Sequence, residues 1–251
     1  RAVVVTEGDK LSAVEAVERR LRRAGGGRVQ IMAVRTRYPL GAEKQIVQTV
    51  TGREVPPGGS AIDAACIVLN VATVFAIQDA LFQGRPLTHR AVTITGGAVT
   101  RPRNLWVPIG TPLRHLLETC GGLKEEADLI ITGGPMMGVA LQSLEAPVMK
   151  DTNSLVCLTA WEHKPDTPSG VCIRCGKCVR ACPMHLVPTI IRRALEDHDL
   201  QKLSRYHLED CNACGCCSFI CPAQIPLVET VAQAASLVRK GGASYDGQLR
   251  A

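Results

Sequence analysis

The sequence predicts a multidomain protein that combines an α/β domain, a small α+β module and a helical domain rich in cysteine. Three observations carry this prediction. They are a strand–helix–strand order at the start, short strands around one helix in the middle, and nine of the 12 cysteines between residues 172 and 221. The 251 residues suffice for two or three domains, and 46% hydrophobic residues with only 3% aromatics indicate aliphatic cores. This much aliphatic surface excludes a largely disordered chain.

Residues 1–85 are predicted to form a partial Rossmann-like α/β domain. Apolar runs at residues 2–5 and 29–34 indicate strands, and apolar residues at helical spacing fill residues 10–23 between them. The order strand, helix, strand favours a parallel sheet. The rest of this domain is expected to contain a helix over residues 42–50, a short strand over 67–69 and a helix over 73–82.

Residues 86–160 are predicted to form the small α+β module. Strands are expected over residues 91–95, 105–109 and 128–132, separated by Gly and Pro turns, with one short helix over 112–119. A module of roughly eighty residues is typical of a compact domain.

Residues 161–240 are predicted to form the cysteine-rich domain. A polar, Pro-containing linker over residues 161–169 leads into it. A helical spacer over residues 187–205 separates two copies of one cysteine pattern, and residues 241–251 are expected to be a flexible tail.

Both cysteine runs have the form C-x2-C-x2-C-x3-C-P, which binds cubane [4Fe-4S] clusters in bacterial ferredoxins. In each run three thiolates can surround three corners of a cube, and the fourth cysteine points away to complete the other cube. Two adjacent cubanes have one common purpose, which is to pass single electrons along a chain. The predicted ligands of the first cluster are Cys172, Cys175, Cys178 and Cys221, and those of the second are Cys211, Cys214, Cys217 and Cys182.

Zinc is the alternative metal for these cysteines, but zinc sites gain nothing from a third cysteine at the same interval, so iron–sulfur clusters are favoured. Cys216 lies off the interval and is interpreted as a small buried neighbour of the ligands. Cys66, Cys120 and Cys157 stand in apolar segments and are interpreted as core residues. The segment GGPMMG at residues 133–138 lacks the frame of a phosphate-binding loop and is interpreted as a structural turn with Met packing.

The formal charge of +6 does not indicate nucleic-acid binding. The densest basic run, at residues 19–23, is interpreted as a solvated helix face, because the three Tyr, three Phe and two Trp are too few for base stacking. Each predicted cluster with its four thiolates contributes about −2, so the loaded chain carries about +2. The longest apolar stretch free of formal charges covers residues 64–78, too short to cross a bilayer, and no transmembrane helix is expected.

Several stretches of the sequence together resemble one family. They are YPLGAEKQIVQTVTGREVPPGG at residues 38–59, VLNVATVFAIQDAL at 68–81, GGPMMG at 133–138 and the two cysteine runs that follow. In this order they are similar to the C subunit of the Rnf complex, the membrane-associated ferredoxin:NAD oxidoreductase of bacteria and some archaea. The similarity runs from about residue 1 to residue 238.

The resemblance implies a peripheral electron-transfer subunit of an oxidoreductase that is also a translocase. Such a protein binds FMN and two [4Fe-4S] clusters, uses NAD(H) as substrate, and lies at the cytoplasmic face of the cell membrane. Its implied partners are other Rnf subunits, including the iron–sulfur B subunit, with ferredoxin as an indirect partner. The complex couples the electron transfer to translocation of Na+ or H+, and residues 86–160 are implied to be a β-grasp module of the soluble-ligand-binding (SLBB-like) type.

The resemblance also implies which residues border the flavin and the nicotinamide. The family is related to the NADH-binding flavoprotein subunit of respiratory complex I, whose nucleotide-site segments align with residues 38–46 and 69–73. Ala42 and Leu69 replace the first acidic residue and the first Asn of those segments, so part of that contact set is absent. No catalytic side chain is assigned. The implied cofactor-binding residues are Tyr38, Gly41, Glu43, Asn70 and Thr73.

Local chemistry offers a structural interpretation for two of these residues. Glu43 fits an acid at a helix start, favoured by the helix dipole, and Asn70 fits a helix cap. The Gly-rich loop that holds the flavin phosphate in this family lies N-terminal to the present sequence, which begins RAVVV without an initiator Met. We therefore expect a further N-terminal part, and a chain that is incomplete for FMN binding and catalysis by itself.

Two other functions stay open at this point. A cobalamin reductase of the propanediol-utilisation type resembles the same architecture. A stand-alone iron–sulfur electron relay without a nucleotide site would need only the cysteine-rich domain.

Overall fold

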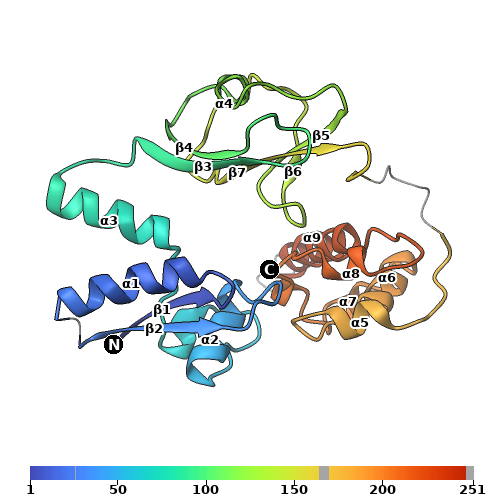
Figure 1. The fold of residues 1–251 in the computed structure, drawn as a ribbon. Helices are drawn as coiled ribbons and strands as arrows, with labels where there is room; N and C mark the ends of the chain where they lie inside the picture. The colour runs from blue at the N-terminus through green and yellow to red at the C-terminus, as the bar shows by residue number, and fades with distance from the viewer. Residues whose placement is uncertain (26, 164–169, 247–251) are drawn as a thin grey trace. The chain divides into compact units, whose positions relative to one another are not determined.

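The chain divides into two compact units, residues 1–68 and residues 69–251. The computed structural model describes residues 1–25, 27–163 and 170–246 (Figure 1). Over these residues no helix is both long enough and apolar enough to span a membrane. The predicted domain limits at residues 85, 160 and 240 stay predictions.

The first unit is built on a two-stranded parallel sheet. β1 (Ala2–Glu7) and β2 (Val29–Val34) pair in parallel, from Ala2 opposite Val29 to Glu7 opposite Val34. α1 (Leu11–Arg23) connects the two strands. The strand–helix–strand order therefore produces the parallel pairing that it predicted.

A small apolar core closes the other half of the first unit. Val47 of α2 (Glu43–Thr51) packs against the short 3-10 helix η1 (Ala61–Ala64). The strand predicted over residues 67–69 is wrong, because this segment has no regular structure and Ile67 is 80% exposed. No described strand lies beside it to pair with its backbone, and an extended segment without such pairing does not persist as a strand.

The second unit begins with an exposed helix and continues with a mixed sheet. α3 (Val71–Gln83) has no buried residue. The sheet has the strand order β4-β3-β7-β5-β6, with β3 and β7 parallel and the other neighbours antiparallel. Its strands and the one helix between them are β3 (His89–Thr95), β4 (Arg103–Pro108), α4 (Leu113–Thr119), β5 (Ala127–Thr132), β6 (Val139–Ala140) and β7 (Ser154–Thr159).

One continuous core joins this sheet to α4. Ile94 of β3, Leu116 of α4 and Leu155 of β7 are fully buried together. At the end of β3 the chain passes so close to β7 that a Cβ at Gly96 would stand 2.0 Å from the carbonyl oxygen of Cys157. The backbone of Gly96 also has a φ of 109°, so only glycine fits there.

The cysteine-rich part of the second unit is helical. Its core comes chiefly from α6 (Pro188–Glu196) and α9 (Leu227–Asp246), with Ile191, Leu203 and Val231 fully or almost fully buried. The predicted spacer over residues 187–205 consists of two helices, and α9 continues six residues into the predicted tail, whose residues 247–251 lie outside the described part. The helices are α5 (Lys177–Ala181), α6 (Pro188–Glu196), α7 (Leu200–Leu203), η2 (Leu208–Asp210), α8 (Cys216–Phe219) and α9 (Leu227–Asp246).

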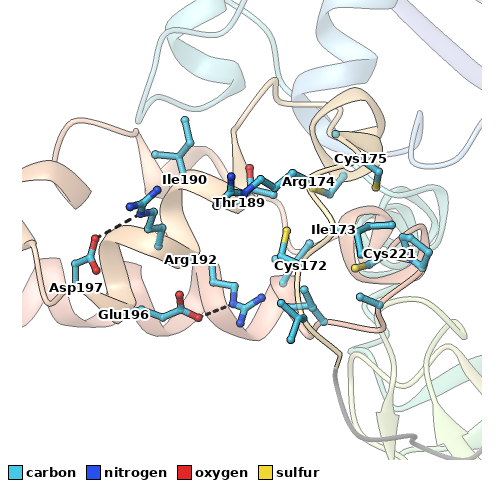
Figure 2. A pocket seen from close by; sticks show the side chains of 18 residues that line it. Cys172, Ile173, Arg174, Cys175, Thr189, Ile190, Arg192, Glu196, Asp197 and Cys221 are labelled. Atoms are coloured by element: carbon cyan, nitrogen blue, oxygen red, sulfur yellow. Dashed lines mark hydrogen bonds and ion pairs between the residues drawn. The ribbon is translucent and has the colours of Figure 1, made fainter.

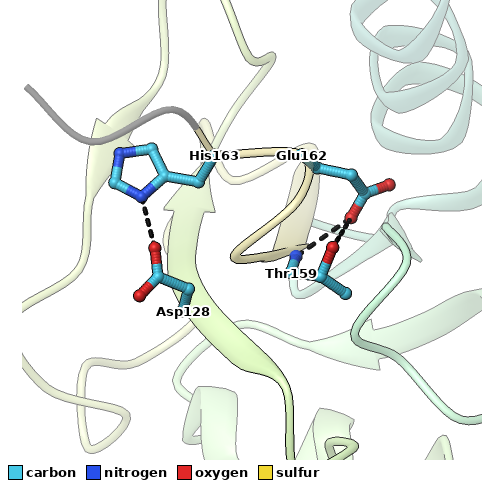
Figure 3. Close-up of polar contacts among 4 residues, drawn as sticks. All are labelled: Asp128, Thr159, Glu162 and His163. Atoms are coloured by element: carbon cyan, nitrogen blue, oxygen red, sulfur yellow. Dashed lines mark hydrogen bonds and ion pairs between the residues drawn. The ribbon is translucent and has the colours of Figure 1, made fainter.

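Two side chains fix the chain where it leaves the mixed sheet (Figure 3). The Glu162 carboxylate accepts hydrogen bonds from the backbone N–H of Thr159 at 3.0 Å and from its hydroxyl at 3.2 Å. The same carboxylate accepts the backbone N–H of Gly97 at 3.1 Å, and His163 Nδ1 shares a hydrogen bond with Asp128 of β5. The predicted linker at residues 161–169 therefore begins from a fixed point, and residues 164–169 lie outside the described part.

We expect the Glu162 contacts to make the stability of the second unit depend on pH. The hydrogen bonds from Thr159 hold the pKa of the Glu162 carboxyl below its ordinary value of 4.5. A lowered pKa stabilises the fold above the ordinary value, and this contribution is lost as the pH falls through the lowered pKa. The difference in Tm between wild type and Glu162→Gln, measured by calorimetry on the whole chain, should be largest above pH 4.5 and vanish at lower pH.

Glu125→Gln is the matched control, because Glu125 is an exposed carboxylate of the same module. It should leave Tm unchanged across the same pH range. Identical melting curves for wild type and Glu162→Gln at neutral pH would contradict the role of Glu162.

Candidate metal centre

The two cysteine runs fold as copies of one backbone, offset by 39 residues from Cys172 to Cys211. Gly176 and Gly215 precede α5 and α8, with φ values of 71° and 82°. Non-glycine residues repeat the left-handed conformation at matching places as well: Arg174 and Ala213 at 56° and 51°, and His185 and Gln224 at 56° and 51°. Such conformations are uncommon outside glycine, so their recurrence shows that the cysteine spacing imposes one loop shape twice.

The first predicted set of thiols lines a single cavity. Cys172, Cys175 and Cys178 of the first run surround it together with Cys221 of the second run, as Figure 2 shows for the labelled side chains. The cavity volume is about 490 Å³. Among the described residues, no three His, Cys, Asp or Glu side chains lie close enough together to bind a single metal ion. A donor set of four thiols spread around a cavity fits a multi-iron cluster.

The second predicted set gathers in the same way around a smaller cavity. Cys211, Cys214 and Cys217 line it together with Cys182 of the first run. Apolar side chains, among them Leu186 and Val231, complete the lining. This cavity, of about 20 Å³, is much smaller than the first, and its donor set has the same chemistry.

Burial makes these thiols poor thiolates without a metal. Desolvation raises the pKa of Cys178, and it raises the pKa of Cys217 to about 12. Neighbouring thiolates add to both shifts, with Cys221 acting on Cys178 and Cys182 acting on Cys217. Each fourth cysteine is therefore close enough to influence the run that it is predicted to complete. A positively charged iron core supplies the compensation that water no longer gives.

Cys216 lies among the ligands of the second set without belonging to the repeat. It lines the second cavity, and burial followed by its hydrogen bond with Cys214 raises the pKa of its thiol to about 11. Cys120 and Cys157 are fully buried in the core of the mixed sheet, and burial raises the pKa of Cys157 to about 11. Cys66 packs at the edge of the small core of the first unit. Cys120 and Cys157 are thus core residues as predicted, whereas Cys66 and Cys216 are only half-buried.

Three of the predicted flavin and nicotinamide residues lie at the start of α2 in the first unit. Tyr38 is 48% exposed, and a Cβ at Gly41 would meet no atom within 4 Å. Glu43 accepts a hydrogen bond from the backbone N–H of Ala61 at 2.7 Å, which ties η1 to the first turn of α2. Residue type suggested a role for Glu43 at the helix start, and the structure adds this contact 18 residues along the chain.

The other two predicted cofactor residues lie at the start of α3 in the second unit. The Asn70 side chain accepts a hydrogen bond from the backbone N–H of Ala72 at 2.9 Å and so caps the helix. Thr73 is exposed on the first turn. Asn70 therefore has the structural role that local chemistry suggested, and the flavin roles of all five residues stay predictions.

A contact between the turn at residues 133–138 and the second cysteine run was not predicted from the sequence. The carbonyl oxygen of Met136 lies 2.7 Å, and its methyl carbon 3.3 Å, from the place where a Cβ at Gly215 would stand. The Met packing that the segment suggested is therefore directed at the loop between Cys214 and Cys216. No spacing rule points to this contact, because its partners are far apart in the sequence.

Three family models match successive parts of the chain. The Nuo51 FMN-binding domain matches residues 1–79, the SLBB domain residues 91–140, and the 4Fe-4S dicluster domain residues 166–222. The last match contains both cysteine runs. FMN and two [4Fe-4S] clusters are thus the cofactors of the domain families present in the chain.

Curated relatives match most of this chain but less than half of their own length. The C subunit of the proton-translocating ferredoxin:NAD(+) oxidoreductase complex of Clostridium ljungdahlii is 44% identical over 191 residues, 76% of this chain and 41% of that protein. The C subunit of the ion-translocating oxidoreductase complex of Rhodobacter capsulatus is 43% identical over 227 residues, which are 90% of this chain and 43% of that protein. The C subunit of the Na(+)-translocating ferredoxin:NAD(+) oxidoreductase complex of Acetobacterium woodii is 40% identical over 188 residues, which are 75% of this chain and 42% of that protein. The chain spans about two fifths of the length of these relatives.

Cys221→Ser is expected to remove the cluster of the first run, although Cys221 belongs to the second run. Iron per chain after anaerobic purification should fall from about eight to about four atoms, because each cubane needs its fourth thiolate. Cys216→Ser is the matched control and should keep about eight, since Cys216 lies outside the repeat. Stoichiometric zinc with little iron in the wild-type protein would contradict the iron–sulfur assignment.

Gly215→Ala is expected to destabilise the protein more than Gly176→Ala does. Both backbones have positive φ, so each alanine carries a conformational cost of about 1–2 kcal/mol. At Gly215 the new methyl also meets the Met136 carbonyl at 2.7 Å, whereas at Gly176 it meets only the flexible end of Arg180 at 3.3 Å. Thermal unfolding of the two variants measures the difference, and equal losses of Tm would show that the Met136 contact does not hold the loop.

Proposed function

We propose that the chain belongs to the family of the C subunits of ion-translocating oxidoreductase complexes, and that it is the peripheral electron-transfer part of a ferredoxin:NAD(+) oxidoreductase. The similarity to three such proteins, at 40–44% identity, supports this function. The order of the matched FMN-binding, SLBB and dicluster domains supports it as well. The activity is that of the whole subunit in its complex, to which this chain contributes these three parts.

The observation that carries the proposal is the exchange of fourth cysteines between the two thiol sets. Cys221 lines the first cavity and Cys182 lines the second, so each cavity is lined by thiols from both runs. When bound, FMN exchanges hydride with a nicotinamide, and the clusters carry single electrons. In this proposal the chain's own residues bind the two clusters side by side, exclude water from the second set, and leave an edge of the first set exposed.

The proposed nucleotide-site residues are Tyr38, Gly41, Glu43, Asn70 and Thr73. The open surroundings of Gly41 support a close approach of a ligand to the backbone. Glu43 uses one carboxylate oxygen, Oε1, to hold the Ala61 N–H, and a carboxylate has further lone pairs for the hydroxyl groups of a ribose. These residues would orient the cofactor and the nicotinamide, and the rest of the flavin site would come from other parts of the subunit.

The partners in this proposal are the other subunits of the complex, including its iron–sulfur B subunit, with ferredoxin reached indirectly. NADH is the small-molecule substrate. The protein would lie at the cytoplasmic face of the membrane and be held there by its partners. Translocation of Na+ or H+ would belong to the membrane subunits.

The full-length protein loaded with FMN is expected to oxidise NADH in the presence of an artificial electron acceptor. The same protein without FMN is the control and should be inactive, because hydride transfer needs the flavin. Stopped-flow absorbance of NADH measures both. Absence of NADH oxidation by the loaded protein would refute the proposed enzyme function, and cobalamin reduction that competes well with ferredoxin would favour a cobalamin reductase.

A further inference from the structure

The two cysteine runs share a backbone but differ in charge. Between its first and last cysteine the first run carries Arg174, Lys177 and Arg180 and no acidic residue. The second run, from Cys211 to Cys221, carries no charged residue. The first run therefore carries three exposed positive residues, of which Arg174 lines the first cavity, and the second run has none at the matching positions.

The two runs also differ in exposure. Cys175 is exposed, whereas its counterpart Cys214 is 7% exposed. Val171 and Ile173 beside the first set are 88% and 67% exposed. The loop at Gly215 is covered by Met136. The first set therefore has an exposed thiol that another protein can reach, whereas no thiol of the second set is exposed.

The three positive charges are not needed to balance a bound cluster. Both sites would carry the same cluster charge on the same backbone, and the second does so without any charged residue in its run. Other arginines at the same cavity are paired with acidic residues. Arg192 and Arg193 of α6, which line the same cavity, pair with Glu196 and Asp197 (Figure 2). No ion pair of Arg174, Lys177 or Arg180 is found among the described residues.

We propose that this surface, which we call the basic rim (Val171, Ile173, Arg174, Cys175, Lys177 and Arg180), docks an acidic face of another redox-active subunit of the same complex. The proposal rests on the proposed function, since it assigns a partner to the first of the two sites. Complementary charge guides and orients such a contact. Two exposed aliphatic side chains beside the thiol give the contact a small apolar centre, as in the small interfaces of electron-transfer proteins.

An acidic protein fits the rim better than an anionic membrane does. The same charges would attract an anionic membrane, but binding to a membrane does not explain why a thiol of the first set is exposed beside them. A redox partner requires this arrangement, because electron transfer depends on close approach to a cluster edge. A membrane contact is therefore an outcome of the experiment that would overturn the proposal.

The test uses the purified complex with its full-length C subunit and a zero-length carbodiimide, which joins a lysine amine to a carboxylate in direct contact. We expect Lys177 to form an amide with an Asp or Glu of a subunit that holds an iron–sulfur cluster or a flavin, identified by mass spectrometry of the cross-linked peptides. Lys177→Arg keeps the charge but lacks the amine. It should lose the cross-link and keep its place in the complex.

A second measurement follows binding of the C subunit to the complex that lacks it. Arg174→Glu with Lys177→Glu should weaken binding roughly tenfold or more at low salt, and the difference should shrink at high salt, because screening removes the charge contribution. Arg205→Glu with Arg239→Glu is the matched control. It makes an equal change of charge at exposed positions of the same domain outside both cavities, and it should leave binding unchanged.

Two results would overturn the proposal. One is an intact complex in which Lys177 forms no cross-link to another subunit, or in which the rim variant binds as the control does. The other is a rim variant that binds the complex normally but has lost binding to vesicles of anionic lipid. Iron content and the absorption spectrum of each variant separate these failures from a failure of the proposed function, which would show as missing clusters in the wild-type protein.

Discussion

Both candidate sites depend on one constraint, which is that the fourth thiol lining each cavity comes from the other cysteine run. A run alone supplies three thiols, so neither site is complete until the two runs lie together. The apolar core between α6 and α9, with Ile191 and Val231 buried in it, brings them together. Burial of this core therefore offsets the chain entropy of closing the segment between the runs. Any change that separates the helices opens both sites at once.

The parts of the fold that could be predicted from the sequence are those with a local signature. The spacing within each cysteine run fixes a loop shape that recurs with the same backbone angles, and the segment at residues 29–34 forms the predicted strand between turn signals. β7 was missed because Leu155, Val156 and Cys157 in it are all buried. A strand covered on both faces loses the alternation of apolar and polar residues by which a half-exposed strand is found.

The contacts that position the sites could not be predicted, since they join distant residues without a pattern. Glu162 holds the N–H of Gly97 across 65 residues, and Glu43 holds that of Ala61 across 18. The Met136 carbonyl reaches Gly215 from another part of the second unit. Each is a single polar group or close approach whose partner is set only by the folded backbone. The residue type of Glu43 indicates a role at the helix start, but it does not indicate which backbone N–H the carboxylate accepts a hydrogen bond from.

The exposed position of Cys175 has a consequence for oxidative damage. An edge that lets electrons pass to another protein also admits oxygen and peroxide, to which thiolates and exposed iron–sulfur clusters are vulnerable. Damage would begin at the first site, while the second is sheltered behind Met136 and apolar side chains. Because Cys221 belongs to the second run, loss of the first cluster would also free the end of the loop that surrounds the second. Oxygen sensitivity of the whole domain would then be set by its most accessible thiol.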